Sequence, residues 1–204
     1  MPERPLRAQA ALLLAVFACT TRGPVGAPQA TGIGSPSDAR TPATSVTQGP
    51  SAPSLRGPFN ADAALAFAGR LAGEIGPRPA GSSGDARARA LVAGELRRAG
   101  WTVSEEPFAL PQGGVTANVV ALQHSPRPGR HVVIGAHLDT VVGSPGANDN
   151  ASGVGVIVAL ARELVDETPG VPVVLVAFGA EEYQPSEPRR HHVGSEQYAA
   201  SHAG

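Results

Sequence analysis

Three stretches of the sequence decide the fold: HVVIGAHLD at residues 131–139, PGANDNASG at residues 145–153 and VVLVAFGAEE at residues 173–182. Continuous apolar runs over 131–136 and 171–178 are typical of strands that are covered on both faces. Between these runs, apolar residues recur at helical spacing over 151–165. A strand, a helix and a second strand in this order predict a right-handed crossover that joins two parallel strands.

Polar residues follow both predicted strands. His137 and Asp139 come directly after the first strand, and Glu181 and Glu182 come after the second. Asp149 lies at the start of the intervening helix. Because parallel strands place their carboxyl ends at one edge of the sheet, we expect all five residues in the crevice where open α/β sheets bind ligands.

Imidazole and carboxylate groups are ordinary zinc ligands, and one carboxylate can bridge two metal ions. Asp149 is well placed for such a bridge, and Asp139 is placed to orient the imidazole of His137. Of Glu181 and Glu182, one is expected to bind metal while its neighbour takes a proton from an activated water molecule. Any of these residues alone would be uninformative, but their joint placement favours a metal hydrolase.

Four motifs resemble the successive motifs of the secreted di-zinc aminopeptidases, metallopeptidase family 28 of the MH clan: GPRPAG (76–81), HLDTV (137–141), PGANDNASG (145–153) and VAFGAEE (176–182). The resemblance extends from about Phe59 to the end of the sequence. Related dimetal carboxypeptidases and deacylases share HLDTV, so NDNASG together with the paired Glu residues is the discriminating part. The implied fold is α/β: a three-layer sandwich with a central mixed, mostly parallel sheet flanked by helices, with its C-terminal part missing.

The resemblance also implies roles for individual residues. His137 would bind one zinc ion, Asp149 would bridge two zinc ions, and Glu182 would bind the second. Glu181 would be the general base and Asp139 the outer residue that orients the imidazole. The implied reaction is hydrolysis of the peptide bond at peptide or protein N-termini. The family has a further Asp and a late His ligand without counterparts in this sequence, so each ion is expected to have two protein ligands instead of three.

Three functional hypotheses follow. The sequence is the N-terminal portion of a zinc aminopeptidase, or an inactive truncated fragment, or a non-peptidase relative such as a glutaminyl cyclase on the same fold. The resemblance leaves all three open.

The first 58 residues differ in composition from the rest. Arg4 and Arg7 precede an apolar run at 10–18, which predicts a signal peptide over 1–19 and export to the cell envelope or the medium. The sequence before Cys19 resembles a lipoprotein cleavage site, so both a lipid anchor at Cys19 and ordinary cleavage nearby are expected alternatives. Residues 20–58, rich in Pro, Gly, Ser and Thr, predict a disordered linker, and a partial zinc-exopeptidase domain is expected over 59–204.

The composition of the sequence limits the binding partners and site types that we expect. A formal net charge of −1 gives no reason to expect binding to nucleic acid. The single cysteine excludes an internal disulfide framework and a cysteine-based zinc site. The apolar run at 10–18 is far shorter than the roughly 20 residues of a membrane span, so contact with a membrane is expected only through Cys19.

The remaining predicted elements are helices at 60–75, 84–99 and 193–203 and strands at 101–109 and 115–122. Asn60 is a favourable N-cap, and Gly100 is a typical helix stop. The turn sequence PQGG between the two strands predicts an antiparallel hairpin at an edge of the sheet.

Overall fold

The computed structural model describes residues 14–15, 59–111, 113–123, 130–167, 171–182 and 191–202. The predicted signal peptide with Cys19 and the predicted linker at 20–58 lie outside these residues, apart from Leu14 and Ala15. Within the described part, none of the helices combines the length and the apolar character that a bilayer crossing requires.

The helices are α1 (Ala61–Arg70), α2 (Ser83–Arg98), α3 (Ser152–Leu164) and α4 (Val193–His202). A π-helical turn, η1 (Leu71–Ile75), follows α1, and a kinked turn, η2 (Ala147–Ala151), precedes α3; Asp149 and Asn150 in η2 have non-helical backbone angles. The strands are β1 (Leu14–Ala15), β2 (Thr102–Ala109), β3 (Val115–Leu122), β4 (Val132–His137) and β5 (Val173–Phe178). The predicted elements therefore occur close to their expected bounds. One difference is that the first predicted helix ends in the wider turn η1, which is closed by a hydrogen bond from the Gly76 N–H to the Leu71 carbonyl.

The helix ends follow from local side chains. The side chain of Asn60 accepts a hydrogen bond from the Ala63 N–H at 2.9 Å, as predicted, and starts α1. Ser82 does the same for α2, where its hydroxyl accepts from the Asp85 N–H at 3.1 Å. Gly100, with φ of 92°, follows the end of α2 in a conformation that favours glycine.

The strands form one mixed sheet in the order β1-β4-β5-β3-β2. β4 and β5 are parallel and are joined through α3, and β2 and β3 form the antiparallel hairpin at the edge, both as predicted. β5 also pairs with β3 in antiparallel orientation, so the described pairings are half parallel and half antiparallel. Beyond β4, the two residues of β1 pair with Val133 and Ile134.

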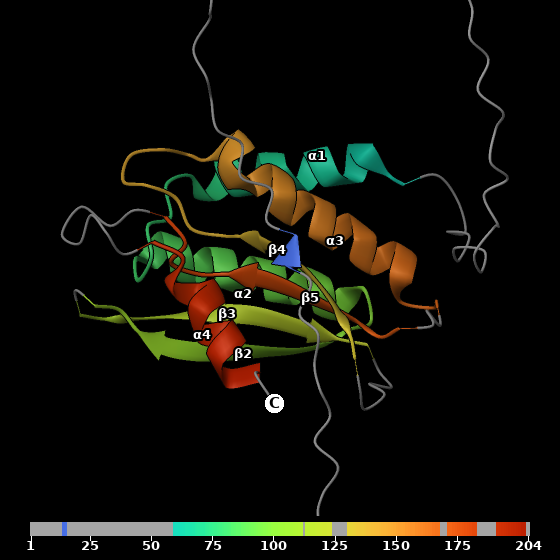
Figure 1. Cartoon of the computed structure of the whole chain (residues 1–204). Helices are drawn as coiled ribbons and strands as arrows, with labels where there is room; N and C mark the ends of the chain where they lie inside the picture. The colour runs from blue at the N-terminus through green and yellow to red at the C-terminus, as the bar shows by residue number, and fades with distance from the viewer. Residues whose placement is uncertain are drawn as a thin grey trace, which may run out of the picture.

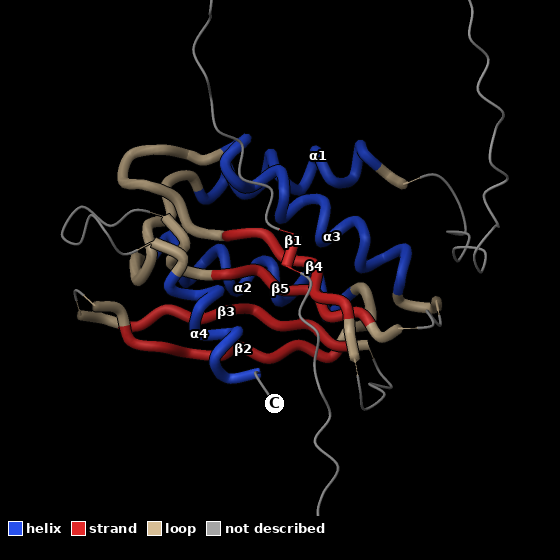
Figure 2. Tube along the Cα trace, viewed as in Figure 1, coloured by secondary structure: helices blue, strands red, loops and turns tan. Residues whose placement is uncertain are grey.

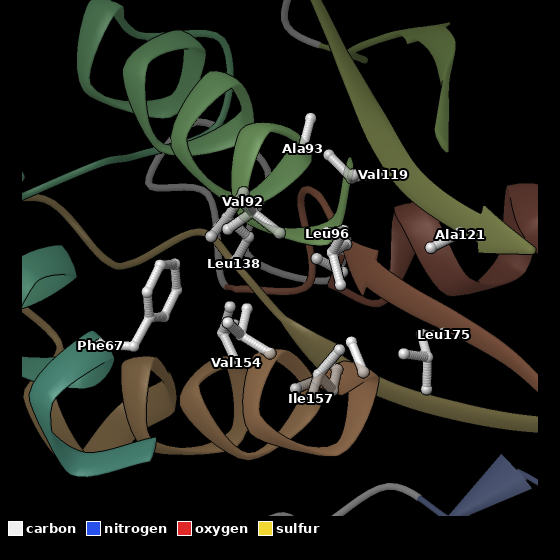
Figure 3. Close-up of a cluster of buried hydrophobic side chains, with 14 of the residues drawn as sticks. Phe67, Val92, Ala93, Leu96, Val119, Ala121, Leu138, Val154, Ile157 and Leu175 are labelled. Atoms are coloured by element: carbon white, nitrogen blue, oxygen red, sulfur yellow. The ribbon is translucent and has the colours of Figure 1, made fainter. Parts of the chain in front are cut away.

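Helices α1, α2 and α3 pack on one face of this sheet, where α1 and α3 lie side by side (Figure 1). Alternate residues of β3 and β5, such as Val119 and Leu175, point into this layer. Figure 3 shows Phe67 of α1 and Val154 of α3 in the same cluster. This is the main hydrophobic core, and it fixes α3 and its preceding loop against the end of β4.

The opposite face of the sheet is covered by α4 (Figure 1). Val120, Val176 and Phe178 form a second buried cluster with Tyr198 of α4, and the rings of Phe178 and Tyr198 meet edge to face at 5.8 Å. Helices thus flank both faces of the mixed sheet, and the predicted three-layer fold is confirmed. The loops after β4 and β5 leave the sheet on the same side (Figure 2).

Candidate metal centre

The edge formed by the carboxyl ends of β4 and β5 carries all five predicted residues. His137 is the last residue of β4 and pairs in register with Phe178, the last residue of β5. Glu181 and Glu182 follow β5 after two residues, and Asp149 lies in η2, directly before α3. The crossover expected from the sequence therefore brings residues from three separate segments to one place.

Three of these side chains converge. Donor atoms of His137, Asp149 and Glu182 all lie within 4.8 Å of one another. The His137 Nε2 atom is 2.9 Å from Asp149 Oδ1 and 3.9 Å from Glu182 Oε1. One imidazole nitrogen and two carboxylate oxygens are a donor set that zinc accepts.

Oxygen atoms face both ring nitrogens of His137. Its Nδ1 lies 3.2 Å from the backbone carbonyl oxygen of Asp139, and its Nε2 faces the carboxylate of Asp149. Both ring nitrogens therefore face acceptors, whereas a neutral imidazole carries only one N–H. Either a second proton or a metal ion at Nε2 satisfies this arrangement, so the residues fit a metal ion.

Asp139 is completely buried below the donor group. Its two carboxylate oxygens accept the N–H groups of Glu181 and Glu182, each at 3.0 Å. Burial raises the pKa of Asp139 to about 6, although these two hydrogen bonds and the neighbouring His137 act in the opposite direction. The carboxylate therefore fixes the backbone of the Glu181–Glu182 turn.

The contact with His137 differs from the expected one. We expected the Asp139 carboxylate to orient the imidazole, but its Oδ1 is 3.9 Å from His137 Nδ1. The backbone carbonyl of the same residue makes the closer contact. Asp139 therefore orients the ring through its main chain and orients the Glu pair through its side chain.

The Glu181 carboxylate is hydrogen-bonded at the start of α4. Its Oε1 accepts the Ser195 N–H at 2.6 Å and its Oε2 accepts the Ser195 hydroxyl at 2.8 Å. The Nδ1 atom of His192 lies 3.3 Å from the same Oε2. Adjacent glutamates thus have separate surroundings: Glu182 joins the metal donors, and Glu181 is held by a helix N-terminus.

Buried contacts fix that helix N-terminus. The Asn118 side chain accepts the Gly179 N–H at 3.0 Å and donates to the Gly194 carbonyl at 2.9 Å. A Cβ at Gly194 would overlap the Gly179 carbonyl oxygen, so α4 approaches the end of β5 as closely as glycine allows. Asn118 on β3 therefore helps to position Ser195 against Glu181.

Sequence reasoning did not identify Ser195, Asn118 or Arg78, although Arg78 lies in a motif that carried the resemblance. Arg78 is buried beside the loop after β4 and donates to the Leu138 carbonyl at 2.6 Å. The occurrence of an arginine inside the GPRPAG motif was the available signal, since arginines in the other predicted elements occupy helix faces typical of solvent exposure.

A mixed sheet between helix layers, with metal donors at its carboxyl edge, defines the zinc-exopeptidase class of α/β fold. Residues 118–203 match the family model described as Peptidase family M28. The match covers 86 of the 204 residues and supports a partial member of peptidase family M28. The prediction of this family from the sequence motifs is confirmed.

Relatives support this placement. The uncharacterized protein YfbL of Escherichia coli K12 is 40% identical over 97 residues, covering 44% of this chain and 29% of the relative. Aminopeptidase YwaD of Bacillus subtilis strain 168 is 47% identical over 51 residues, covering 25% of this chain and 11% of the relative. The matched region thus spans less than a third of these two curated relatives.

Solved structures share the fold. The glutaminyl cyclase of Porphyromonas gingivalis has a TM-score of 0.61 at 29% identity, with 69% of this chain and 53% of that chain covered. BSAP, a zinc aminopeptidase from Bacillus subtilis, has a TM-score of 0.62 at 18% identity, with 72% and 66% covered. The chain thus corresponds to between half and two thirds of these folded domains.

Proposed function

We propose that this chain supplies catalytic residues of a zinc aminopeptidase, which hydrolyses the N-terminal peptide bond of peptides or proteins. The observation that carries the proposal is the convergence of the His137, Asp149 and Glu182 donor atoms within 4.8 Å of one another, with Glu181 adjacent in sequence. The match of residues 118–203 to the Peptidase family M28 model and the aminopeptidase relatives support the same reaction class.

In this proposal, His137, Asp149 and Glu182 would hold zinc, and the two oxygens of the Asp149 carboxylate would allow it to serve two ions. Bound zinc polarises the peptide carbonyl and lowers the pKa of a water molecule to about 7. His137 keeps its Nδ1 hydrogen bond to the Asp139 carbonyl, which leaves Nε2 to face the metal. Asp139 holds the Glu181–Glu182 turn so that both carboxylates start from fixed backbone positions.

Glu181 is the proposed general base. It takes a proton from the attacking water and returns it to the nitrogen of the leaving peptide as the C–N bond breaks. Hydrogen bonds from the N–H and the hydroxyl of Ser195 hold its carboxylate before substrate binds. This step requires Glu181 to turn from Ser195 towards the substrate.

Glutaminyl cyclisation is the second candidate activity, and the 29% identity to the P. gingivalis glutaminyl cyclase favours it. In that reaction the N-terminal amine of a glutaminyl peptide attacks its own side-chain amide, and ammonia leaves. Both reactions need a polarised carbonyl and a proton carrier, so the same residues suit either one.

The test is a product assay on the purified, zinc-loaded chain. An aminoacyl p-nitroanilide and a glutaminyl peptide are incubated separately, and nitroaniline, free amino acid, pyroglutamyl peptide and ammonia are measured. Release of nitroaniline with the free amino acid supports the aminopeptidase proposal. Ammonia and pyroglutamyl peptide alone replace it with the cyclase. A folded, zinc-loaded chain that forms neither product overturns both activities for this chain and favours the inactive-fragment hypothesis.

We also propose that the protein acts outside the cytoplasm, because Arg4, Arg7 and the apolar run at 10–18 have the pattern of an export signal. Fractionation of cells that express the whole chain tests this location. Labelling with a fatty acid that is lost in Cys19→Ser would support the lipid anchor. An unlabelled chain in the culture medium would support ordinary cleavage, and an unprocessed chain in the cytoplasm would contradict export.

A further inference from the structure

Arg78 has a different setting from the other arginines in the described part of the chain, because it alone is fully buried. It belongs to the GPRPAG segment, which the proposed reaction does not use. Placing a guanidinium ion in the interior is unfavourable unless its N–H groups are satisfied. Burial accordingly lowers the pKa of Arg78, while the charge of Asp139 acts in the opposite direction.

The hydrogen bonds of this guanidinium, within the described residues, go to backbone carbonyls. Nε donates to Leu138 at 2.6 Å, Nη1 donates to Pro145 at 2.7 Å, and Nη2 donates to Gly146 at 3.0 Å. A longer bond of 3.2 Å joins Nη1 to Gly76 in its own segment. One planar group therefore binds two parts of the chain that meet at the metal donors.

These acceptors lie next to the donor residues. Leu138 stands between His137 and Asp139, and Gly146 precedes Asp149 by three residues. The Gly146 carbonyl also accepts the Ala151 N–H at 3.1 Å, so the same oxygen takes part in the turn that carries Asp149. The guanidinium thereby links the end of β4, which carries His137, to the loop before α3, which carries Asp149. The side chains of these two residues lie 2.9 Å apart.

The backbone of Arg78 reinforces this link. Its N–H donates to the Thr140 hydroxyl at 3.0 Å, and its carbonyl accepts the Thr140 N–H at 3.4 Å. A Cβ at Gly146 would overlap the Thr140 side chain and would come within 3.2 Å of Arg78 Nη2. The segments are packed too closely for one to shift without the other.

We propose that Arg78 is a positioning residue, which presets the spacing of His137 and Asp149 for metal binding by holding their two segments through backbone carbonyls. The inference rests on the metal centre of the proposed function and goes beyond it. Arginine suits this task because its rigid fork presents N–H groups in several fixed directions, whereas the ammonium of lysine is a single compact charge. A donor set that is held in place before binding loses less entropy when the metal arrives.

Zinc affinity of the purified chain, measured by competition with a chromophoric chelator, tests the inference. Arg78→Lys keeps the charge but loses the fork, so we expect affinity to fall by about 10–100-fold, as for other residues that orient metal ligands. The visible spectrum of bound Co²⁺ should also change, since it reports coordination geometry. Arg162→Lys is the matched control, because Arg162 pairs with Glu95 in a network outside the donor group. It should change affinity by less than about twofold.

A second pair of variants covers the case in which Arg78→Lys does not fold. Thr140→Val removes the hydroxyl that accepts the Arg78 N–H and should weaken zinc binding. Thr116→Val is the control: it removes a buried hydroxyl that donates to Asp85 at 2.8 Å, and it should leave zinc binding unchanged. Far-UV circular dichroism selects the variants that retain the fold.

Wild-type zinc affinity and an unchanged Co²⁺ spectrum in folded Arg78→Lys would overturn the positioning role, as would equal losses in Arg162→Lys. If Arg78→Lys is unfolded, wild-type zinc affinity in Thr140→Val would overturn the positioning role instead. A wild-type chain that binds no zinc overturns this inference together with the metal centre. Zinc binding without hydrolysis or cyclisation overturns the proposed function alone.

Discussion

The Nε2 atom of His137 lies 2.9 Å from Oδ1 of Asp149, although one residue ends β4 and the other precedes α3. The Asp149 side chain is 63% exposed, so this contact faces an edge that solvent and metal ions can reach. A carboxylate oxygen and an imidazole nitrogen in such proximity are stabilised by a cation held near both.

Removal of either partner should weaken zinc binding. We expect Asp149→Asn and His137→Ala to lower zinc affinity by more than the roughly 10–100-fold that outer-shell changes produce. Asp62→Asn, which alters an exposed carboxylate in the first turn of α1, is the control and should bind zinc as the wild type does. Chelator competition measures all three, and undiminished affinity in Asp149→Asn would exclude that residue as a ligand.

Substitution of the two adjacent glutamates should affect different properties, zinc binding at Glu182 and hydrolysis at Glu181. Glu182→Gln should lower zinc affinity, because Glu182 belongs to the converging donor group. Glu181→Gln should leave zinc content close to that of the wild type and lower hydrolysis of an aminoacyl anilide by about 10²–10⁴-fold, the usual contribution of a general base. Metal analysis and kcat on the same preparations separate the two effects. Full activity in Glu181→Gln would rule out the general-base assignment.

Close packing at the start of α4 predicts an effect on stability. Gly194→Ala should lower the free energy of unfolding by about 1–3 kcal/mol, because the added methyl group would overlap the Gly179 carbonyl. Gly69→Ala in α1 is a matched control, since a Cβ there meets nothing within 4 Å. That variant should be more stable by about 0.5–1 kcal/mol. Urea unfolding followed by circular dichroism measures both, and equal stabilisation of the two would contradict the contact at Gly194.

The interactions of Glu95 with neighbouring arginines predict that the free energy of unfolding depends on pH. Burial by itself raises the pKa of this carboxyl, but the hydrogen bond from Arg70 and the charges of Arg98 and Arg70 outweigh burial and lower the pKa below its ordinary value of 4.5. A lowered pKa in the folded state contributes stability that is fully present above pH 4.5 and is lost as the pH falls through the folded-state value.

Glu95→Gln should therefore be less stable than the wild type by about 1–2 kcal/mol at pH 7, since the paired arginines are partly exposed. The difference should narrow below pH 4.5. Glu74→Gln, which breaks a longer ion pair to Arg70 at 3.8 Å, should stay within about 0.5 kcal/mol of the wild type. Urea titrations at several pH values test this, and a constant difference down to pH 2 would refute the assigned linkage.

The parts of the site that the sequence could predict are those set by chain topology. Parallel strands connected by a helix place their carboxyl ends together, so the meeting of His137 with Glu182 followed from two apolar runs and one amphipathic helix. The hairpin of β2 and β3 and the Asn60 cap are equally local and were equally accessible from sequence.

Contacts that depend on three-dimensional packing could not be read in this way. The Asp139 carboxylate binds the N–H groups of the Glu181–Glu182 turn instead of the imidazole, because β4 and β5 are neighbours at that depth. Ser195 reaches Glu181 only because Asn118 and glycine at position 194 bring α4 against the sheet. Arg78 is buried without any periodic pattern to mark it, since loops carry no repeating exposure.

Trp101, at the exit of α2, gives the molecule a built-in fluorophore. It is the single tryptophan of the chain, it is buried, and its indole N–H donates to the Ala161 carbonyl at 2.8 Å. Ala161 lies about 15 Å along α3 from the turn that carries Asp149, at a rise of about 1.5 Å per residue. Emission from this one indole therefore follows the packing of α2 against α3 without a label, and it does so at a distance from any metal that occupies the edge of the sheet.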